Sequence, residues 1–161
     1  MISIYTIGVY GWDEKSFIDA LEENEIDALI DIRSRRAVRG RIYSFANAKK
    51  LENILSGAAI SYRYMKELSP TREVRNVQAA SDQMTNVSKG KRSHLSDDFI
   101  KAYSATILSN IDSGALFQTL GQYRHPCLLC VEGPASACHR SIVSELISRD
   151  NDIPLHNIAR H

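Results

Sequence analysis

The 161-residue sequence predicts an α/β fold, a three-layer Rossmann-like domain with helices on both faces of a mostly parallel sheet of about five strands. One observation and one general rule of chain topology lead to this prediction. Short runs rich in β-branched and aliphatic residues alternate with segments whose apolar residues recur at helical spacing. A helix that connects two parallel strands lies over the sheet, because such connections are right-handed. The length suits a single domain, 1–161, because one apolar core can reach this size without splitting.

The first half of the chain contains two strand–helix–strand units. Residues 2–7 are rich in β-branched and aromatic residues and end at Gly8, which predicts a strand. A helix follows, because Asp13 is a typical N-cap and Phe17 and Leu21 recur at helical spacing. The next short apolar run suits a parallel strand buried on both faces. The expected elements are a strand at 2–7, a helix at 13–24, a strand at 27–32, a helix at 47–55 and a strand at 59–64.

The second half begins with an insertion. The stretch from Met65 to Arg92 is polar, contains Pro70 and has little periodicity beyond a short helix near 72–80, so we expect it to cover the strand ends. Ser96 is a typical N-cap for a helix with an apolar face. Further apolar patterns predict a helix at 113–123, a strand at 127–131, a helix at 137–149 and a strand at 153–158.

The composition excludes several classes of protein. Hydrophobic residues make up 43% and charged residues 24%, which is close to average globular usage and excludes a disordered chain or a disulfide-dense scaffold. No apolar run approaches the roughly 20 residues that cross a bilayer, and no signal peptide is recognisable. Three cysteines lie within twelve residues, an odd number that favours reduced thiols. We therefore expect a cytoplasmic protein without a membrane partner.

Positive charge is concentrated in the middle of the chain. Residues 1–31 contain eight acidic residues and one basic residue, whereas residues 32–101 contain fifteen basic and six acidic residues. Five arginines fall between positions 33 and 41: Arg33, Arg35, Arg36, Arg39 and Arg41. Such a cluster attracts anions, and phosphate is the natural candidate. The alternative is a solvated basic loop that pairs with the acidic first helix.

Polar residues follow the predicted strands at the points where these strands end. Asp31 and Arg33 are two residues apart, so they share one face of an extended strand, and Glu132 follows the fourth strand. Ligands of such folds bind beyond the carboxyl ends of the strands. The Asp31–Arg33 pair can hold a carboxylate ionised for acid–base chemistry or can be a buried structural ion pair, and for the pair alone we prefer the structural interpretation.

A tight loop after Glu132 leads to Cys138, His139 and Arg140, which we expect in the first turn of a helix. Free backbone amides at a helix N-terminus attract anions and favour a thiolate. The spacing differs from the Cys-x5-Arg cradle of phosphatases and rhodaneses. A loop that caps the helix and positions a ligand is therefore preferred over covalent thiol catalysis.

The cysteines and the histidine also offer four possible zinc ligands: Cys127, Cys130, Cys138 and His139. Residues three apart in a strand point to opposite faces, so Cys127 and Cys130 cannot reach one ion without a turn. Buried cysteines are common small hydrophobic residues. We therefore expect no metal and no cofactor.

Several motifs together resemble the DUF488 family of uncharacterised proteins. The resemblance runs along nearly the whole chain and rests on Thr6-Ile7-Gly8, on Ile30-Asp31-Ile32-Arg33-Ser34-Arg35-Arg36-Ala37-Val38-Arg39-Gly40, on Tyr43-Ser44-Phe45-Ala46-Asn47, on Lys66-Glu67-Leu68-Ser69-Pro70-Thr71, and on Leu128-Leu129-Cys130-Val131-Glu132 with Cys138-His139-Arg140-Ser141. It implies a three-layer α/β fold and an unassigned activity. It also implies that one site contains Asp31, Arg33, Cys130, Glu132, Cys138, His139 and Arg140.

One position departs from the family pattern. The family usually has a histidine after Thr-Ile-Gly, whereas this chain has Val9 and then Tyr10. A mechanism that uses that histidine as a base is therefore not expected here.

These observations lead to two hypotheses about function. The first is an enzyme, a hydrolase or transferase, that acts on a nucleotide or nucleic-acid component held at a phosphate-binding, arginine-rich edge. The second is a non-catalytic module that binds nucleic acid or a nucleotide. We favour the enzyme because a binder needs only arginine and lysine, whereas several ionisable types meet here. The expected catalytic residues are Asp31, Glu132, Cys138 and His139. The expected substrate-binding residues are Arg33, Arg36, Arg39, Tyr43, Phe45, Asn47, Lys66 and Arg140, through phosphate contacts, base stacking and base-edge recognition.

Overall fold

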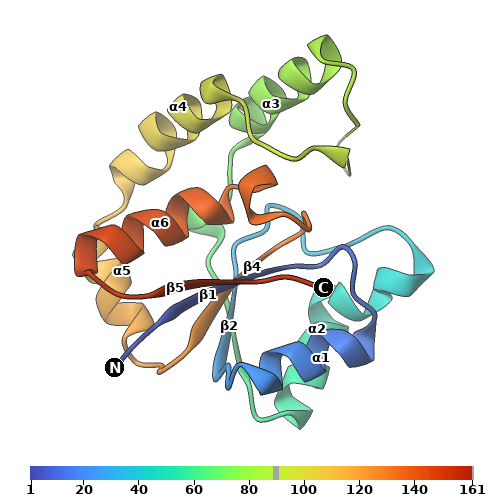
Figure 1. The fold of residues 1–161 in the computed structure, drawn as a ribbon, viewed down its shortest axis with the longest axis vertical. Coiled ribbons are helices and arrows are strands. Elements are labelled where there is room, and N and C mark those ends of the chain that lie inside the picture. Colours follow the sequence, from blue (N-terminus) through green and yellow to red (C-terminus); the bar gives the residue numbers. More distant parts are fainter. Residues whose placement is uncertain (89–90, 161) are drawn as a thin grey trace.

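A computed structural model describes residues 1–88 and 91–160 of the chain (Figure 1). Its strands are β1 (Ile4–Gly8), β2 (Ala28–Asp31), β3 (Ser61–Tyr64), β4 (Pro126–Cys130) and β5 (Leu155–Ile158). Its helices are α1 (Glu14–Glu23), α2 (Ala48–Gly57), α3 (Arg72–Met84), α4 (Asp97–Thr106), α5 (Ser113–Leu120) and α6 (Arg140–Asn151). Short 3-10 helices lie at Arg41–Ala46, Lys66–Leu68, Leu108–Asn110 and Ala135–Ala137. No helix in the described ranges is both long enough and apolar enough to span a membrane.

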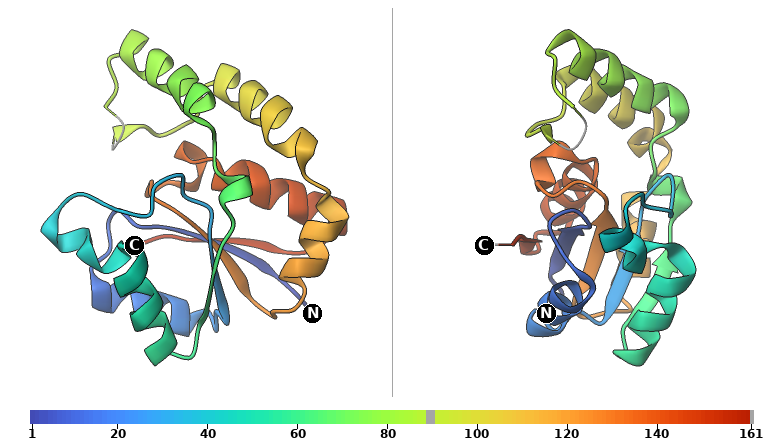
Figure 2. Two further views of the ribbon diagram at one scale, coloured as in Figure 1. Left: turned by 180° about the vertical axis from the view of Figure 1, so that it is seen from behind. Right: turned by 90° about the vertical axis from the view of Figure 1, so that its right-hand side faces the viewer.

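The five strands form one parallel sheet in the order β3-β2-β4-β1-β5. Helices α1 and α2 cover one face and α5 and α6 cover the other, so the predicted three-layer α/β fold is confirmed (Figure 2). Phe17 of α1, Leu51 of α2 and Leu29 of β2 belong to one core, whereas Val143 of α6 and Ile30 of β2 belong to the other. Side chains alternate between the two faces of each strand, which is why β1, β2, β4 and β5 contribute to both cores, whereas β3 contributes only Tyr62, to the core with α1 and α2.

The insertion between β3 and β4 extends the layer that contains α6. Helices α3 and α4 lie beyond α6 as a pair (Figures 1 and 2). Val74 of α3 and Phe99 of α4 join the same core as Val143. The segment before α4 is also fastened to the rest of the domain, because the backbone N–H of Leu95 donates to the carbonyl of Ser136, 3.0 Å away. The predicted insertion, 65–92, thus contains α3, which pairs at one end of the sheet with the separately predicted helix α4.

One helix start differs from the expectation. The helix expected from residue 137 begins at Arg140, because Ala135–Ala137 form a separate 3-10 turn and Cys138 has an extended backbone with φ −137° and ψ 146°. His139 occupies the N-cap position. Cys138 therefore lies just before the helix rather than in its first turn, and it belongs to the loop that connects β4 to α6.

The strand ends bring distant residues to one edge of the sheet. Gly8, at the end of β1, is paired in register with Cys130 of β4, and Asp31 of β2 is paired with Leu129. All strands are parallel, so their carboxyl ends share this edge. Glu132 continues from β4 at the same edge.

Candidate functional site

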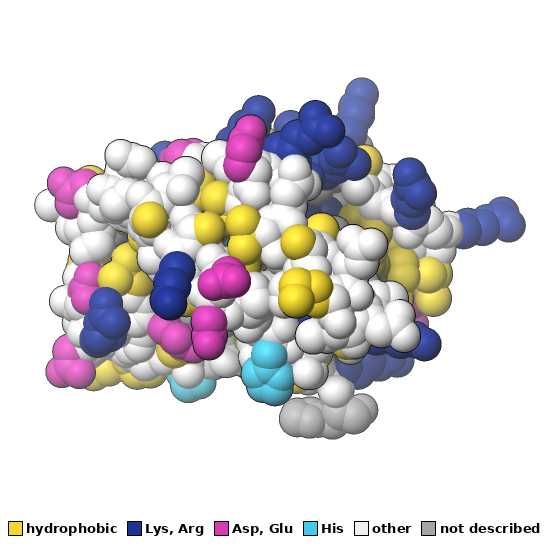
Figure 3. All heavy atoms as spheres, turned by 90° about the horizontal axis from the view of Figure 1, so that it is seen from above, with side chains coloured by type: hydrophobic (Ala, Val, Ile, Leu, Met, Phe, Trp, Pro, Cys, Tyr) yellow, Lys and Arg dark blue, Asp and Glu magenta, His cyan; other side chains and the backbone are white. Residues whose placement is uncertain are grey.

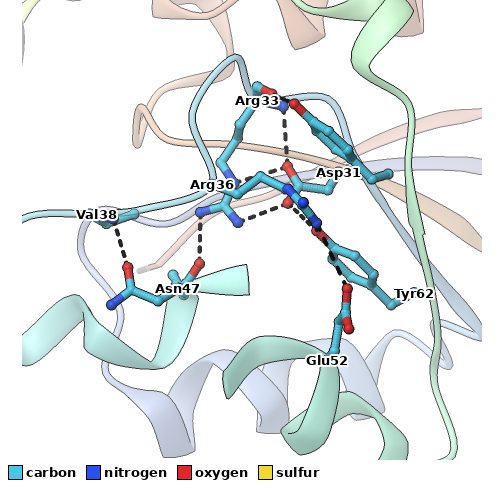
Figure 4. Close-up of polar contacts among 9 residues, drawn as sticks. Asp31, Arg33, Arg36, Val38, Asn47, Glu52 and Tyr62 are labelled. Atoms are coloured by element: carbon cyan, nitrogen blue, oxygen red, sulfur yellow. Dashed lines mark hydrogen bonds and ion pairs between the residues drawn. The ribbon is translucent and has the colours of Figure 1, made fainter. Parts of the chain in front are cut away.

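Asp31 and Arg33 form a fully buried ion pair at the end of β2 (Figure 4). The guanidinium of Arg33 donates from Nη2 to Oδ2 of Asp31 at 2.8 Å and from Nε to Oδ1 at 2.9 Å. Tyr62 on β3 donates its hydroxyl to Oδ2 at 2.6 Å, and Arg33 donates from Nη1 to the carbonyl of Ala46 at 2.8 Å. The arginine-rich loop, residues 33–46, ends at Ala46 in a 3-10 helix, so the ion pair fastens this loop to the sheet.

A second set of contacts holds the outer part of the same loop. The guanidinium of Arg36 lies over the ring of Tyr64, 4.1 Å from its centroid, and 3.8 Å from Oε1 of Glu52 on α2. Oδ1 of Asn47 accepts a hydrogen bond from the N–H of Val38 at 2.8 Å, so Asn47 holds the loop and makes no side-chain cap of α2 (Figure 4).

Cys130, Cys138 and His139 form a buried cluster at the carboxyl end of β4. Nδ1 of His139 lies 3.6 Å from Sγ of Cys130 and 3.7 Å from Sγ of Cys138, and all three atoms lie within 4.8 Å of one another. Nε2 of His139 lies 2.9 Å from the carbonyl oxygen of Ile32. A carbonyl only accepts, so Nε2 carries a proton, and Nδ1 faces both sulfurs. Among the described residues, this is the group whose donor atoms suit a metal ion.

The pKa values of the two thiols in this cluster are shifted in opposite directions. Burial alone raises the pKa of Cys138, but the hydrogen bond from Cys130 and the nearby His139 and Arg140 together lower it well below the usual value. Burial raises the pKa of Cys130, and the hydrogen bond that it donates to Cys138 raises this pKa further. The surroundings therefore favour a thiolate at Cys138, with Cys130 as its hydrogen-bond donor.

Arg140 holds the loop between β4 and α6 against β1. Its Nη1 donates to the carbonyl of Glu132 and its Nη2 to that of Gly133 at 2.7 Å, while Nε donates to the hydroxyl of Thr6 at 3.3 Å. Gly8 permits this close approach, because a Cβ at this position would lie 1.8 Å from the carbonyl oxygen of Glu132. The loop that carries Cys138 is thus held by the guanidinium of Arg140 and by its close contact with Gly8 of β1.

A cavity of about 430 Å³ opens at this edge of the sheet, between the arginine-rich loop and α3. Its lining combines the sulfur–imidazole cluster with five arginines and two carboxylates: Cys130, Cys138, His139, Arg33, Arg35, Arg39, Arg75, Arg92, Asp82 and Glu132. Figure 3 shows most lysines and arginines at one end of the upper face and most acidic residues toward the other. An excess of guanidinium groups around a concave site favours an anionic ligand.

The arginines of the cavity differ in how they are held. Arg92 contacts Asp82 at 2.7 Å and Glu132 at 3.7 Å, and its Nε donates to the carbonyl of Ala137 at 3.2 Å, so it connects the insertion to the loop before Cys138. Among the described residues, no ion pair involves Arg35, Arg39 or Arg75. In the same part of the chain, Nε of Arg75 is buried without a hydrogen-bond partner.

The structure brings together only part of the site that the sequence predicts. The predicted residues that line the cavity are Arg33, Arg39, Glu132, Cys138 and His139. Of the remaining predicted residues, all described, none lines it: Asp31, Arg36, Tyr43, Phe45, Asn47, Lys66 and Arg140. Phe45 is buried in the core against Phe17, with ring centroids 5.2 Å apart, and the hydroxyl of Tyr43 accepts from the N–H of Gly11. Lys66 is exposed in a 3-10 helix.

Other cavity residues were not predicted from the sequence. Arg75 and Arg92 belong to the insertion, and Tyr10 follows β1 at the position after Val9. The sequence indicated these two arginines only indirectly, because they lie in the insertion that we expected to cover the strand ends. Val9 itself is buried in the core, so the place of the family's usual histidine is a packing position here.

The fold and the site define an α/β protein with a thiol and imidazole cluster beneath a basic cavity. Residues 13–147 match the family described as Domain of unknown function DUF488. The match covers most of the chain, and the protein belongs to this family. A comparison with curated proteins and one with solved structures each returned no significant match.

Proposed function

We propose that this protein is an enzyme that acts on a small phosphate-containing molecule, such as a nucleotide, bound in the cavity at the carboxyl edge of the sheet. The observation that carries the proposal is the lining of that cavity, which combines buried sulfur and imidazole groups with an excess of arginines. Binding an anion requires only the arginines. Buried groups that exchange protons or attack a substrate are typical of reacting centres.

The substrate end of the cavity consists of Arg35, Arg39 and Arg75. A guanidinium donates two parallel hydrogen bonds to a phosphate, and these charge-assisted bonds are stronger than neutral ones. The buried Nε of Arg75 lacks a partner among the described residues, which supports a ligand that accepts from it.

The size of the cavity favours a small molecule over a polymer. A volume of about 430 Å³ lies within the range of small-ligand pockets, roughly 300–1,000 Å³. The half-buried ring of Tyr10 lines the same cavity and offers an aromatic face for a base. Tyr43 and Phe45, which the sequence suggested for stacking, have other contacts, so they do not support a nucleic-acid platform.

The reacting end of the cavity supplies groups for hydrolysis or group transfer. Cys138 supplies a thiolate, the form in which sulfur acts as a nucleophile or a metal ligand. Glu132 is a buried carboxylate in an ion pair with Arg92, two residues beyond the end of β4, and it is the proposed acid–base group. Asp31 and Arg140 act as positioning residues, because Asp31 holds Arg33 and Arg140 holds the loop of Glu132.

Ligand-binding measurements test whether the arginines at the substrate end of the cavity bind a phosphate-containing molecule. The protein is screened by thermal shift and titration calorimetry against nucleotides, phosphosugars, inorganic phosphate and short oligonucleotides. We expect a mononucleotide or phosphosugar to bind, and Arg75→Ala to weaken it about tenfold or more, because a hydrogen bond to a charged group contributes about 1.5–3 kcal/mol. The matched control is Arg63→Ala, because Arg63 is an exposed arginine of β3 outside the cavity lining.

Turnover of the bound ligand tests the reacting end. Conversion is followed by phosphorus NMR and mass spectrometry with the parent protein and with Cys138→Ser. We expect the variant to keep ligand affinity and lose turnover. Absence of any phosphate-bearing ligand contradicts the whole proposal. Tight binding without conversion of any ligand contradicts the enzyme and favours the non-catalytic nucleotide-binding module.

A further inference from the structure

We infer that Cys130, Cys138 and His139 form a zinc site that has three protein ligands and a fourth position open to the arginine-lined cavity. The inference deepens the proposed function, since it names the chemistry at the reacting end of the same cavity. Zinc binding itself requires no substrate and is measured separately from it.

The distances within the cluster match those of a zinc tetrahedron. Zinc binds sulfur at about 2.3 Å and imidazole nitrogen at about 2.0–2.1 Å, so a tetrahedral angle separates the two ligand atoms by about 3.6 Å. Nδ1 of His139 lies 3.6 Å from Sγ of Cys130 and 3.7 Å from Sγ of Cys138. Nδ1 of an imidazole has one lone pair, and in this cluster it faces two sulfurs at these distances. An ion between the three atoms satisfies all of them.

The imidazole is oriented as in a metal site. Nε2 of His139 lies 2.9 Å from the carbonyl oxygen of Ile32, at the end of β2. Ligating histidines usually donate their second ring N–H to a carbonyl or carboxylate, which fixes the tautomer and the direction of the lone pair. The ring of Tyr103 packs against the imidazole of His139, with ring centroids 5.5 Å apart. The ligand nitrogen is therefore positioned before any ion binds.

The two sulfurs are held by independent anchors. Cys130 is the last residue of β4 and is paired in the sheet with Gly8 of β1. Cys138 ends the following loop, which Arg140 fastens through the carbonyls of Glu132 and Gly133. Cys127 is on the opposite face of β4 and packs in the core beside α1 and α2. The strand geometry that excludes Cys127 as a ligand thus leaves the other three donors together, and the proposed site replaces our expectation of no metal.

Three protein ligands are typical of catalytic zinc sites, in which water or substrate takes the fourth position. All three ligand residues line the cavity, so we expect this position to face it. Zinc lowers the pKa of bound water to about 7 and so supplies hydroxide at neutral pH. In a hydrolysis, bound zinc would supply this activated water, and Glu132, which lines the same cavity, would be the group that accepts its proton and returns it to the leaving group.

Metal content and cobalt spectroscopy test the inference. The full chain is purified with a reductant, loaded with zinc, desalted and analysed for metal by mass spectrometry. We expect one zinc per chain. Cobalt in place of zinc is expected to show cobalt–thiolate charge-transfer bands and the visible bands of tetrahedral cobalt. Cys138→Ser and His139→Ala are expected to lose zinc, whereas Cys127→Ala keeps it and serves as the matched thiol control.

Two results would overturn the inference whether or not the variants fold. One is a loaded parent protein with less than a tenth of an equivalent of zinc and no cobalt–thiolate bands. The other is a Cys130–Cys138 disulfide in the parent protein purified under reductant. If the phosphate ligand still binds and turns over in a metal-free protein, the zinc inference fails and the proposed function stands. If zinc binds but no phosphate compound does, the proposed function fails instead.

Discussion

Removal of the Asp31 carboxylate should destabilise the protein far more than removal of an exposed carboxylate. In Asp31→Ala, the guanidinium of Arg33 stays 1% exposed but loses two hydrogen bonds of 2.8 and 2.9 Å. Tyr62 also loses its 2.6 Å acceptor. Breaking a buried ion pair by removal of one partner costs about 3–5 kcal/mol. For a domain of this size each kcal/mol lowers Tm by about 2–4 °C, so we expect a fall of roughly 6–20 °C.

The matched control is the ion pair between Lys15 and Asp19 of α1. Its atoms are only 2.5 Å apart, but the side chains are 85% and 44% exposed. Exposed pairs contribute about 0–1 kcal/mol, so Asp19→Ala should lower Tm by less than about 4 °C. The two variants therefore compare the loss of a carboxylate from a buried ion pair with its loss from an exposed one.

The assay is thermal unfolding followed by circular dichroism, with urea unfolding for the free energy. An Asp31→Leu/Arg33→Met double variant should recover much of the stability lost in Asp31→Ala, because no unpaired charge remains in the core. If Asp31→Ala shifts Tm no more than Asp19→Ala, the ion pair does not fasten the arginine-rich loop as we argue.

Three further predictions follow from other contacts. Gly8→Ala should lower the free energy of unfolding by about 1–3 kcal/mol and weaken ligand binding, because its Cβ would displace the carbonyl of Glu132. The control is Gly57→Ala, because a Cβ at Gly57 would meet nothing within 4 Å. In urea unfolding this control should leave the free energy of unfolding equal or raise it by up to about 1 kcal/mol. Burial, together with the hydrogen bond to Asp31, raises the pKa of Tyr62 from 10.0 to about 12, so the stability that this proton provides is present below pH 10 and lost between pH 10 and 12. The stability of Tyr62→Phe should accordingly fall less steeply across that pH range, and parallel slopes for variant and parent would contradict this assignment. Glu132→Gln should keep ligand affinity by calorimetry and lose turnover, and full activity would exclude Glu132 as the acid–base group.

The fold was predictable because strand and helix periodicity are local properties of the sequence. Alternating apolar runs indicated all five strands, and the expectation of a parallel sheet with helices on both faces is confirmed. The start of α6 was wrong by three residues. Ala137 continues the apolar pattern of the helix, but its backbone belongs to a 3-10 turn that the pattern does not reveal.

The site was predictable only where it depends on the strand ends. Cys138 and His139 follow β4, so the topology brings them to the edge of the sheet together with Arg33. Arg75 and Arg92 reach the cavity through the packing of the insertion, which leaves no local pattern in the sequence.

Residue type alone was a poor guide to contacts at this edge. Arg140 has the chemistry of a phosphate ligand, but its guanidinium binds backbone carbonyls of its own loop. Phe45 could stack on a base, yet it is buried against Phe17. The roles of such residues depend on which groups lie nearest in the fold, and those neighbours are distant in the sequence.

The most direct test of the central claim is a crystal structure of the protein soaked with tungstate, a phosphate mimic that is located by its anomalous scattering. The proposed function predicts one strong anomalous peak in the cavity, within hydrogen-bond distance of Arg75 or Arg39 and facing the sulfur–imidazole cluster. The peak should be absent from Arg75→Ala soaked in the same way. An empty cavity, or tungstate bound only on the outer surface of the arginine-rich loop, would contradict the claim that this cavity is the phosphate-binding active site.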